Sequence, residues 1–118
     1  MQRIVLVDDD RQLVGVLKEI LSDEGYKVES FEGVKFTQQY EQVKPDALII
    51  DVWFGDEADG VRLSQALANH RRLHNTPLLL ISSDARIAEY ADKVKASDYL
   101  QKPFSIPQML NKLKKLVA

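Results

Sequence analysis

Three acidic residues in a row, Asp8, Asp9 and Asp10, follow directly after the first apolar run of the chain. A further carboxylate, Asp51, follows directly after another apolar run. Carboxylates that lie close together repel and raise one another's pKa unless a cation lies between them. If the two apolar runs form neighbouring strands, this pattern predicts a cation site at their ends.

Two other reactive side chains occupy similar positions. Ser82 follows a third apolar run, and Lys102 follows a short last one, immediately before Pro103. Oxygen ligands without His or Cys favour Mg²⁺, Mn²⁺ or Ca²⁺, and the chain has no cysteine at all. A cation, a carboxylate, a hydroxyl and a lysine together suit phosphoryl transfer. In such a site the carboxylate is the nucleophile, while the metal and the lysine neutralise charge on the phosphoryl oxygens.

The elements that must position these side chains are short strands. Uninterrupted apolar runs are typical of strands buried on both faces, as in a parallel sheet covered by helices. Two weaker runs are expected to form the edges. The three strong runs are Ile4–Val7, Ala47–Ile50 and Leu78–Ile81, and the weak ones are Val28–Phe31 and Tyr99-Leu100.

Helical periodicity fills the gaps between these runs. Ser105 and Gln108 have the spacing of a capping box before the last helix, and Asp10 is interpreted as a cap of the first. Strict alternation of five strands and five helices predicts a doubly wound α/β fold. In such folds ligands bind beyond the carboxyl ends of the strands. The apolar stripes are Leu13, Leu17, Ile20 and Leu21 before Gly25; Phe36, Tyr40 and Val43 before Pro45; Leu63, Leu67 and His70; Ile87, Tyr90, Ala91 and Val94; and Ile106, Met109, Leu110, Leu113, Leu116 and Val117.

Length and composition limit the alternatives. The 118 residues suit a single domain over 1–118. A net charge of −2 offers no case for binding nucleic acid or a membrane surface. No apolar run approaches the length of a membrane span, and no signal peptide is visible, so a cytoplasmic location is expected.

The sequence resembles the receiver domains of two-component response regulators. The resemblance is carried by Val7-Asp8-Asp9, Pro45–Asp51, Ser82 and Asp98–Phe104, which lie in the right order along essentially the whole chain. It implies a flavodoxin-like five-stranded parallel sheet in the order 2-1-3-4-5. It also implies a Mg²⁺-dependent signalling switch that is phosphorylated on an aspartate.

The resemblance further assigns a role to each matching residue. Asp51 matches the phosphoacceptor, and Lys102 the lysine that pairs with the phosphoryl group. Asp9 matches the direct Mg²⁺ ligand, and Asp8 a ligand through water. The remaining assignments are the Trp53 carbonyl as third protein ligand, Ser82 as switch hydroxyl, Tyr99 as switch aromatic, and a cis peptide bond at Lys102–Pro103.

The partners implied by the family are a sensor histidine kinase or a histidine phosphotransfer protein. Phosphorylation is expected to change the face formed by residues 87–117, which would bind an output domain or protein. Homodimerisation through Asp98, Tyr99 and the last helix is a further expectation. Direct binding of nucleic acid is not expected. The domain is not an enzyme in the usual sense, because its substrate is its own side chain and its autodephosphorylation is slow.

Several residues depart from the family pattern. Phe54-Gly55 replace the common Met-Pro, the acidic stretch 56–60 is about one residue longer than usual, and Lys95 stands where Gly is usual. Trp53 is expected to shield a phosphoryl group from water. The altered loop supports an alternative: a pseudo-receiver that acts as a phosphorylation-independent interaction module.

Two other functional classes of protein conflict with particular residues of this chain. An aspartate-nucleophile phosphatase needs a second Asp at the position that Trp53 occupies. A flavodoxin-like cofactor binder needs a phosphate-cradling loop after the first strand, where three carboxylates would repel a phosphate.

Overall fold

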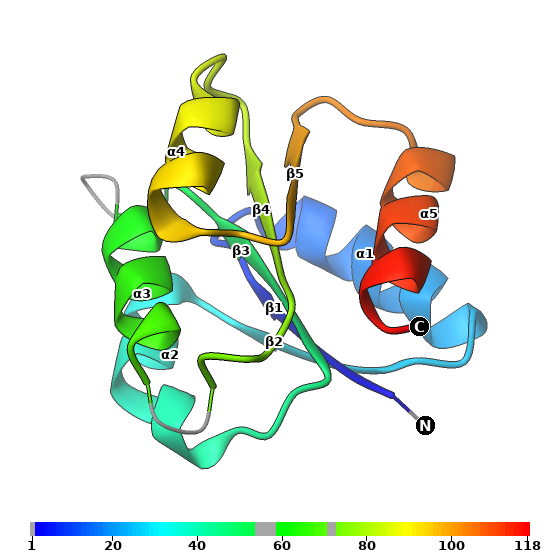
Figure 1. The fold of residues 1–118 in the computed structure, drawn as a ribbon. Helices are drawn as coiled ribbons and strands as arrows, with labels where there is room; N and C mark the ends of the chain where they lie inside the picture. Colours follow the sequence, from blue (N-terminus) through cyan, green and yellow to red (C-terminus); the bar gives the residue numbers. More distant parts are fainter. Residues whose placement is uncertain (1, 54–58, 71–72) are drawn as a thin grey trace.

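A five-stranded, fully parallel sheet forms the centre of the molecule (Figure 1). The computed structural model describes residues 2–53, 59–70 and 73–118. The strand order is β2-β1-β3-β4-β5, which confirms the predicted doubly wound fold and its order 2-1-3-4-5. The strands are β1 (Arg3–Val7), β2 (Lys27–Phe31), β3 (Ala47–Asp51), β4 (Leu78–Ser82) and β5 (Asp98–Gln101).

Helices cover both faces of this sheet. Figure 1 shows α1 and α5 on one face and α2, α3 and α4 on the other. None of the helices in the described part of the chain is long and apolar enough to cross a membrane. The helices are α1 (Arg11–Asp23), α2 (Gly33–Gln39), α3 (Asp59–Ala68), α4 (Ile87–Val94) and α5 (Ile106–Leu116), with a 3₁₀ turn, η1 (Tyr40–Gln42), after α2.

The central strands are apolar throughout because each contributes to two cores. Successive side chains of a strand point to opposite faces. In β1, Val5 therefore packs in the core under α2, α3 and α4, whereas Ile4 packs in the core under α1 and α5. Phe36 is fully buried in the first core and Met109 in the second. The edge strand β2 is only half-buried over most of its length, which explains its weaker apolar pattern.

Side-chain caps fix the starts of two helices. The Asp10 carboxylate accepts from the amide of Leu13 at 3.2 Å and begins α1. Ser105 and Gln108 form the predicted capping box of α5. Each cap satisfies backbone donors that the helix itself leaves without a partner. The start of each helix, and with it the loop that carries Asp8 or Lys102, is thereby held in place.

Two helices end earlier than their apolar stripes suggest. The stripe through Val43 predicts a continuous helix, but α2 ends at Gln39 and Val43 is extended. Pro45 disfavours helical backbone just before it, so the chain tightens and leaves the helix. His70 lies beyond α3, because its amide bonds to the carbonyl of Leu67 at 3.0 Å in a tight turn.

Candidate functional site

The carboxyl ends of β1, β3 and β4 and the residue after β5 meet at one edge of the sheet. Asp8 follows β1 directly, Asp51 ends β3, and Lys102 follows β5. The Nζ of Lys102 lies 2.8 Å from Oδ2 of Asp8 and 3.2 Å from Oδ2 of Asp51. The parallel topology therefore brings together side chains that lie 94 and 51 positions apart in the sequence.

Burial acts against the charged forms of Asp51 and Lys102 in this ion cluster. The Asp51 side chain is 10% exposed and that of Asp8 only 1%. Burial, followed by the nearby charge of Asp8, raises the pKa of Asp51 to about 6, although Lys102 and the Trp53 amide oppose the rise. Burial favours the neutral form of Lys102, but its hydrogen bond to Asp8 and the charges of both carboxylates outweigh this, and its pKa is raised.

Backbone amides orient the two carboxylates. Oδ1 of Asp8 accepts from the amide of Asp10 at 2.9 Å, and Oδ1 of Asp51 accepts from the amide of Trp53 at 3.1 Å. In both residues one oxygen is held by the backbone and the other faces Lys102. The lysine thus acts as the counter-ion of two carboxylates that would otherwise repel each other.

Asp9 takes a different direction from Asp8. Its Oδ1 accepts from the amide of Gly33, at the start of α2, over 2.9 Å. Asp9 lies at a bend after β1, and this hydrogen bond directs its carboxylate toward α2 while Asp8 faces Lys102. Among residues 2–53, 59–70 and 73–118, no three acidic or histidine side chains lie close enough to hold a metal ion. The assignment of Asp9 as a direct ligand remains a prediction.

The chemistry of the donor set nevertheless fits a hard divalent cation. Asp8 and Asp51 supply carboxylate oxygens from buried positions, and the chain has no cysteine to compete as a ligand. Among the residues that the structure describes, Lys102 is the one cation paired with these two carboxylates. A divalent ion would offset the burial and the repulsion by Asp8 that together raise the pKa of Asp51.

The two expected switch residues occupy different environments. Ser82 is fully buried, and its Oγ accepts from the amide of Asp84 at 3.0 Å. Tyr99 is 40% exposed on β5, with Nζ of Lys112 lying 6.0 Å from the centre of its ring. Lys112 also pairs with Asp98 at 3.0 Å. The peptide bond between Lys102 and Pro103 is cis.

Trp53 joins a polar and aromatic cluster near Asp51. Its indole is 40% exposed and packs edge-on against Tyr90 of α4, with ring centres 6.4 Å apart. Hydrogen bonds from Arg86, with a smaller contribution from Trp53, hold the pKa of Asp84 well below its usual range. Arg86 also lies 5.4 Å from the centre of the Tyr90 ring. The position of Asp84 shortly after the run Leu78–Ile81 already placed it at this edge of the sheet. The sequence patterns did not reveal Arg86 and Tyr90 as neighbours of the site, because no motif links them to Trp53.

Gly60 is a second residue whose importance the sequence patterns missed. A Cβ atom at this position would collide with the carbonyl oxygen of Asp51 and lie 2.7 Å from the Cα of Val52. The amide of Gly60 donates to the carbonyl of Val52 at 2.9 Å. Only glycine lets α3 begin so close to the end of β3. In the sequence, Asp59-Gly60 lie before the apolar stripe of Leu63 and Leu67 and indicate only that a helix follows. The preceding residues, Phe54-Gly55 and the acidic part of the loop up to 58, lie outside the described residues.

Comparison with known proteins identifies the family. A sequence model of the response regulator receiver domain matches residues 4–114. The chain belongs to the response regulator receiver domain family. It is 35% identical over 97% of its length to the transcriptional regulatory protein GltR of Pseudomonas aeruginosa, of which it covers 48%. The receiver domain thus spans about half the length of the curated relatives that it matches.

Solved structures agree with this assignment. The signal receiver domain of a histidine kinase from Syntrophus aciditrophicus is 27% identical, with a TM-score of 0.88 over 99% of this chain and 90% of that one. The receiver domain of a sensor histidine kinase from Pseudomonas aeruginosa has the same fold at 22% identity, with a TM-score of 0.87 over 98% and 97%. Receiver domains are the signalling switches of two-component systems, not true enzymes.

Proposed function

We propose that this receiver domain accepts a phosphoryl group on Asp51 from a phosphohistidine of a sensor histidine kinase or a histidine phosphotransfer protein. A carboxylate oxygen of Asp51 attacks phosphorus, the phosphorus–nitrogen bond breaks, and the released imidazole takes up a proton. The observation that carries the proposal is the buried Asp51 carboxylate with Lys102 at 3.2 Å from its Oδ2. A cation so placed can also pair with an oxygen of the transferred phosphoryl group.

The reaction is proposed to depend on Mg²⁺. The side chains of Asp8, Asp9 and Asp51 and the carbonyl of Trp53 would hold the ion. When bound, the ion neutralises charge that develops on the phosphoryl oxygens. The fold neighbour from Pseudomonas aeruginosa was crystallised with a magnesium ion in its active site cleft. In this chain, the buried carboxylates with a single lysine as counter-ion support the same choice.

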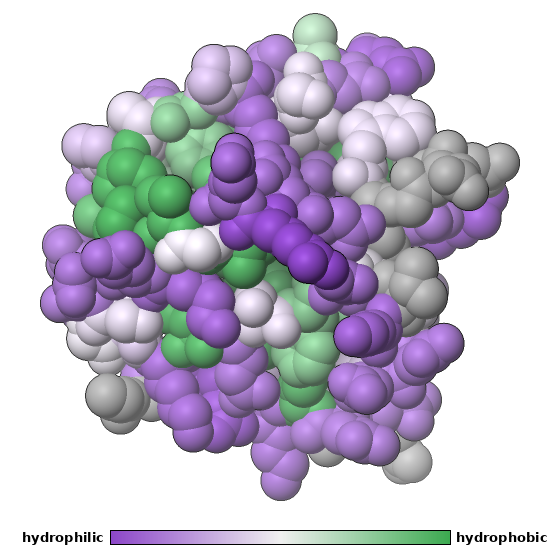
Figure 2. All heavy atoms as spheres, turned by 180° about the vertical axis from the view of Figure 1, so that it is seen from behind, coloured by the Kyte–Doolittle hydropathy of each residue, from purple (hydrophilic) through white to green (hydrophobic). Residues whose placement is uncertain are grey.

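The phosphodonor protein is proposed to dock beside Lys102. An open cavity of about 350 Å³ lies there, lined by Leu13 of α1 and by Pro103, Phe104 and Ile106 around the start of α5. Figure 2 shows apolar side chains gathered over the side of the molecule where α1 and α5 lie. An apolar surface at the entrance of a reactive site suits contact with a protein rather than with a small solute.

The output is proposed to involve the face formed by residues 87–117. Ser82 is linked to the start of this face, because its Oγ accepts from Asp84 in the loop before α4. Recruitment of the Ser82 hydroxyl by a phosphoryl group would change this loop and allow Tyr99 to move inward from its exposed position. The resulting shift between two states would alter binding of an output domain, a protein partner or a second copy of the chain.

The test is phosphorylation in vitro, measured by intact mass. The chain is incubated with a phosphorylated histidine phosphotransfer protein or with acetyl phosphate, with Mg²⁺ and then with EDTA. We expect one added phosphoryl group with Mg²⁺, none with EDTA, and none in Asp51→Asn. The matched control is Asp46→Asn, since Asp46 lies at the opposite end of β3 and accepts from the Arg3 amide at 2.7 Å. Absence of labelling in the wild type would favour the pseudo-receiver alternative.

A further inference from the structure

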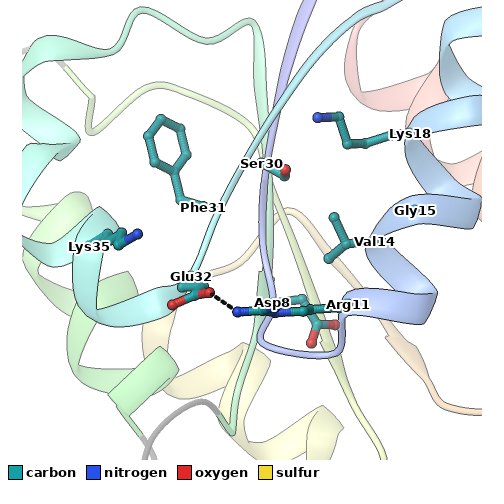
Figure 3. A pocket seen from close by; sticks show the side chains of 9 residues that line it. All are labelled: Asp8, Arg11, Val14, Gly15, Lys18, Ser30, Phe31, Glu32 and Lys35. Atoms are coloured by element: carbon teal, nitrogen blue, oxygen red, sulfur yellow. Dashed lines mark hydrogen bonds and ion pairs between the residues drawn. The ribbon is translucent and has the colours of Figure 1, made fainter.

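A different open cavity, of about 390 Å³, lies between α1 and the segment that joins β2 to α2. Val14 and Gly15 of α1 form one wall, and Ser30 and Phe31 of β2 lie opposite them. Figure 3 shows the cavity from close by. Its volume falls within the range of small-molecule sites, and its walls combine apolar and polar groups, as such sites do.

Gly15 is the first unusual feature of this cavity. It lies in the middle of α1, where glycine is a poor helix former. Nothing lies within 4 Å of a Cβ built at this position, and Gly15 does not have a positive φ. Neither packing nor backbone conformation therefore requires glycine here. What glycine does provide is the open space that a side chain would fill.

Basic groups reach this space from both sides. Lys18 of α1 and Lys35 of α2 extend toward it from opposite walls, and the ion pair between Arg11 and Glu32, 3.2 Å long, crosses one end (Figure 3). Within the described part of the chain, Lys18 and Lys35 have no ion-pair partner. The cavity thus presents two uncompensated cations in a protein whose net charge is −2.

A polar group also lies at the base of the cavity. Ser30 occupies a β2 position on the same face as Val28, which packs toward α1. An apolar residue would be expected at such a position, because it lies under a helix. The Ser30 hydroxyl has no hydrogen-bond partner among residues 2–53, 59–70 and 73–118. It can donate to a ligand held between the two lysines.

We propose that this cavity binds a small organic anion, one with a phosphate or carboxylate group on an apolar body. The charged group lies between Lys18 and Lys35 and accepts from Ser30, while the apolar body lies against Val14 and the backbone of Gly15. Asp8 lines the same cavity and pairs with Lys102. A bound anion would therefore lie next to the ion cluster of Asp8, Asp51 and Lys102 but outside it. Binding of the anion does not require phosphorylation of Asp51.

The test is an NMR titration of the unphosphorylated chain in EDTA, with phenyl phosphate as the first probe and phenylacetate as the second. Benzyl alcohol and inorganic phosphate are the neutral and the non-apolar comparison. We expect saturable amide shifts centred on Gly15 and Ser30 with at least one of the two organic anions, and the stronger binder distinguishes a phosphate from a carboxylate ligand. Equal binding of benzyl alcohol or inorganic phosphate would overturn the proposal, as would the absence of saturable shifts.

Variants locate the binding. Lys18→Gln and Lys35→Gln should each weaken it by about two- to fivefold, and their combination by more. Gly15→Leu should weaken it about tenfold or more by filling the cavity, while the stability of α1 is kept or increased. Lys114→Gln, at an exposed lysine of α5, is the matched control and should bind as the wild type does. Unchanged affinity in both lysine variants and in Gly15→Leu would place the probe elsewhere and refute the assignment.

Discussion

The replacement Asp51→Asn should make the metal-free protein more stable at neutral pH. An unfolded aspartate has a pKa near 3.9, whereas burial and the charge of Asp8 raise the pKa of Asp51 in the fold to about 6. The folded state therefore binds the proton more tightly than the unfolded state does. Above pH 6 the ionised carboxylate destabilises the fold, and below about pH 4 the effect disappears because both states are protonated.

The size of the effect follows from the pKa difference. One pKa unit corresponds to about 1.4 kcal/mol, so a rise of about two units costs the fold about 2–3 kcal/mol at pH 7. The raised pKa already includes the attraction of Lys102, which retains Asp8 as a partner in the variant. Asparagine also keeps an oxygen that can accept from the Trp53 amide. We therefore expect Asp51→Asn to recover nearly all of this free energy of unfolding, which is equivalent to a rise of about 1–2 M in the urea midpoint.

The assay is urea unfolding in EDTA, followed by circular dichroism between about pH 4 and pH 8. Glu19→Gln, at an exposed position of α1, is the control and should change stability by less than about 0.5 kcal/mol at every pH. Addition of Mg²⁺ should stabilise the wild type more than the variant. If Asp51→Asn is no more stable than the wild type at pH 7, or if its gain is the same at pH 4, the reasoning is wrong.

Three further replacements test other parts of the structure. Lys95→Gly should stabilise the fold by about 0.5–1 kcal/mol in urea unfolding, because Lys95 ends α4 with a φ of 57° that glycine adopts without strain; an unchanged midpoint would contradict this. Gly60→Ala should lower stability by about 2 kcal/mol or more, since its Cβ meets the backbone of Asp51 and Val52, and a variant as stable as the wild type would show that α3 can shift freely. Trp53→Asn should shorten the lifetime of phosphorylated Asp51 severalfold once the donor is removed, because we expect the indole, which lies two residues beyond Asp51 and packs on Tyr90, to shield the phosphoryl group from water; equal or slower loss of the label would refute a shielding role.

The sheet could be predicted from the sequence because its strands are buried on both faces. Runs such as Ile4–Val7 contain no polar residue, and four such residues between polar segments are too few for a buried helix. The ends of helices were less predictable. His70 and Val43 have apolar or aromatic neighbours at helical spacing, but local backbone bonds and Pro45 decide where the helix stops.

The sequence was enough to predict which residues meet at the candidate site, because they lie at the ends of strands. The positions of Asp8, Asp51 and Lys102 after their strands were enough to place them together, since parallel strands share an orientation. The direction of each side chain was not predictable. Asp9 turns to the amide of Gly33, and Trp53 reaches α4, because these contacts depend on loops whose paths no periodic pattern encodes.

The sheet separates two apolar cores, one with α4 and the other with α1 and α5. A helix can change its position only by repacking the core that it contacts, and α4 shares none of its buried side chains with the core beneath α1. The surface proposed to receive the donor can therefore keep its shape while α4 moves. The donor protein would then meet the same apolar surface in both states of the proposed switch.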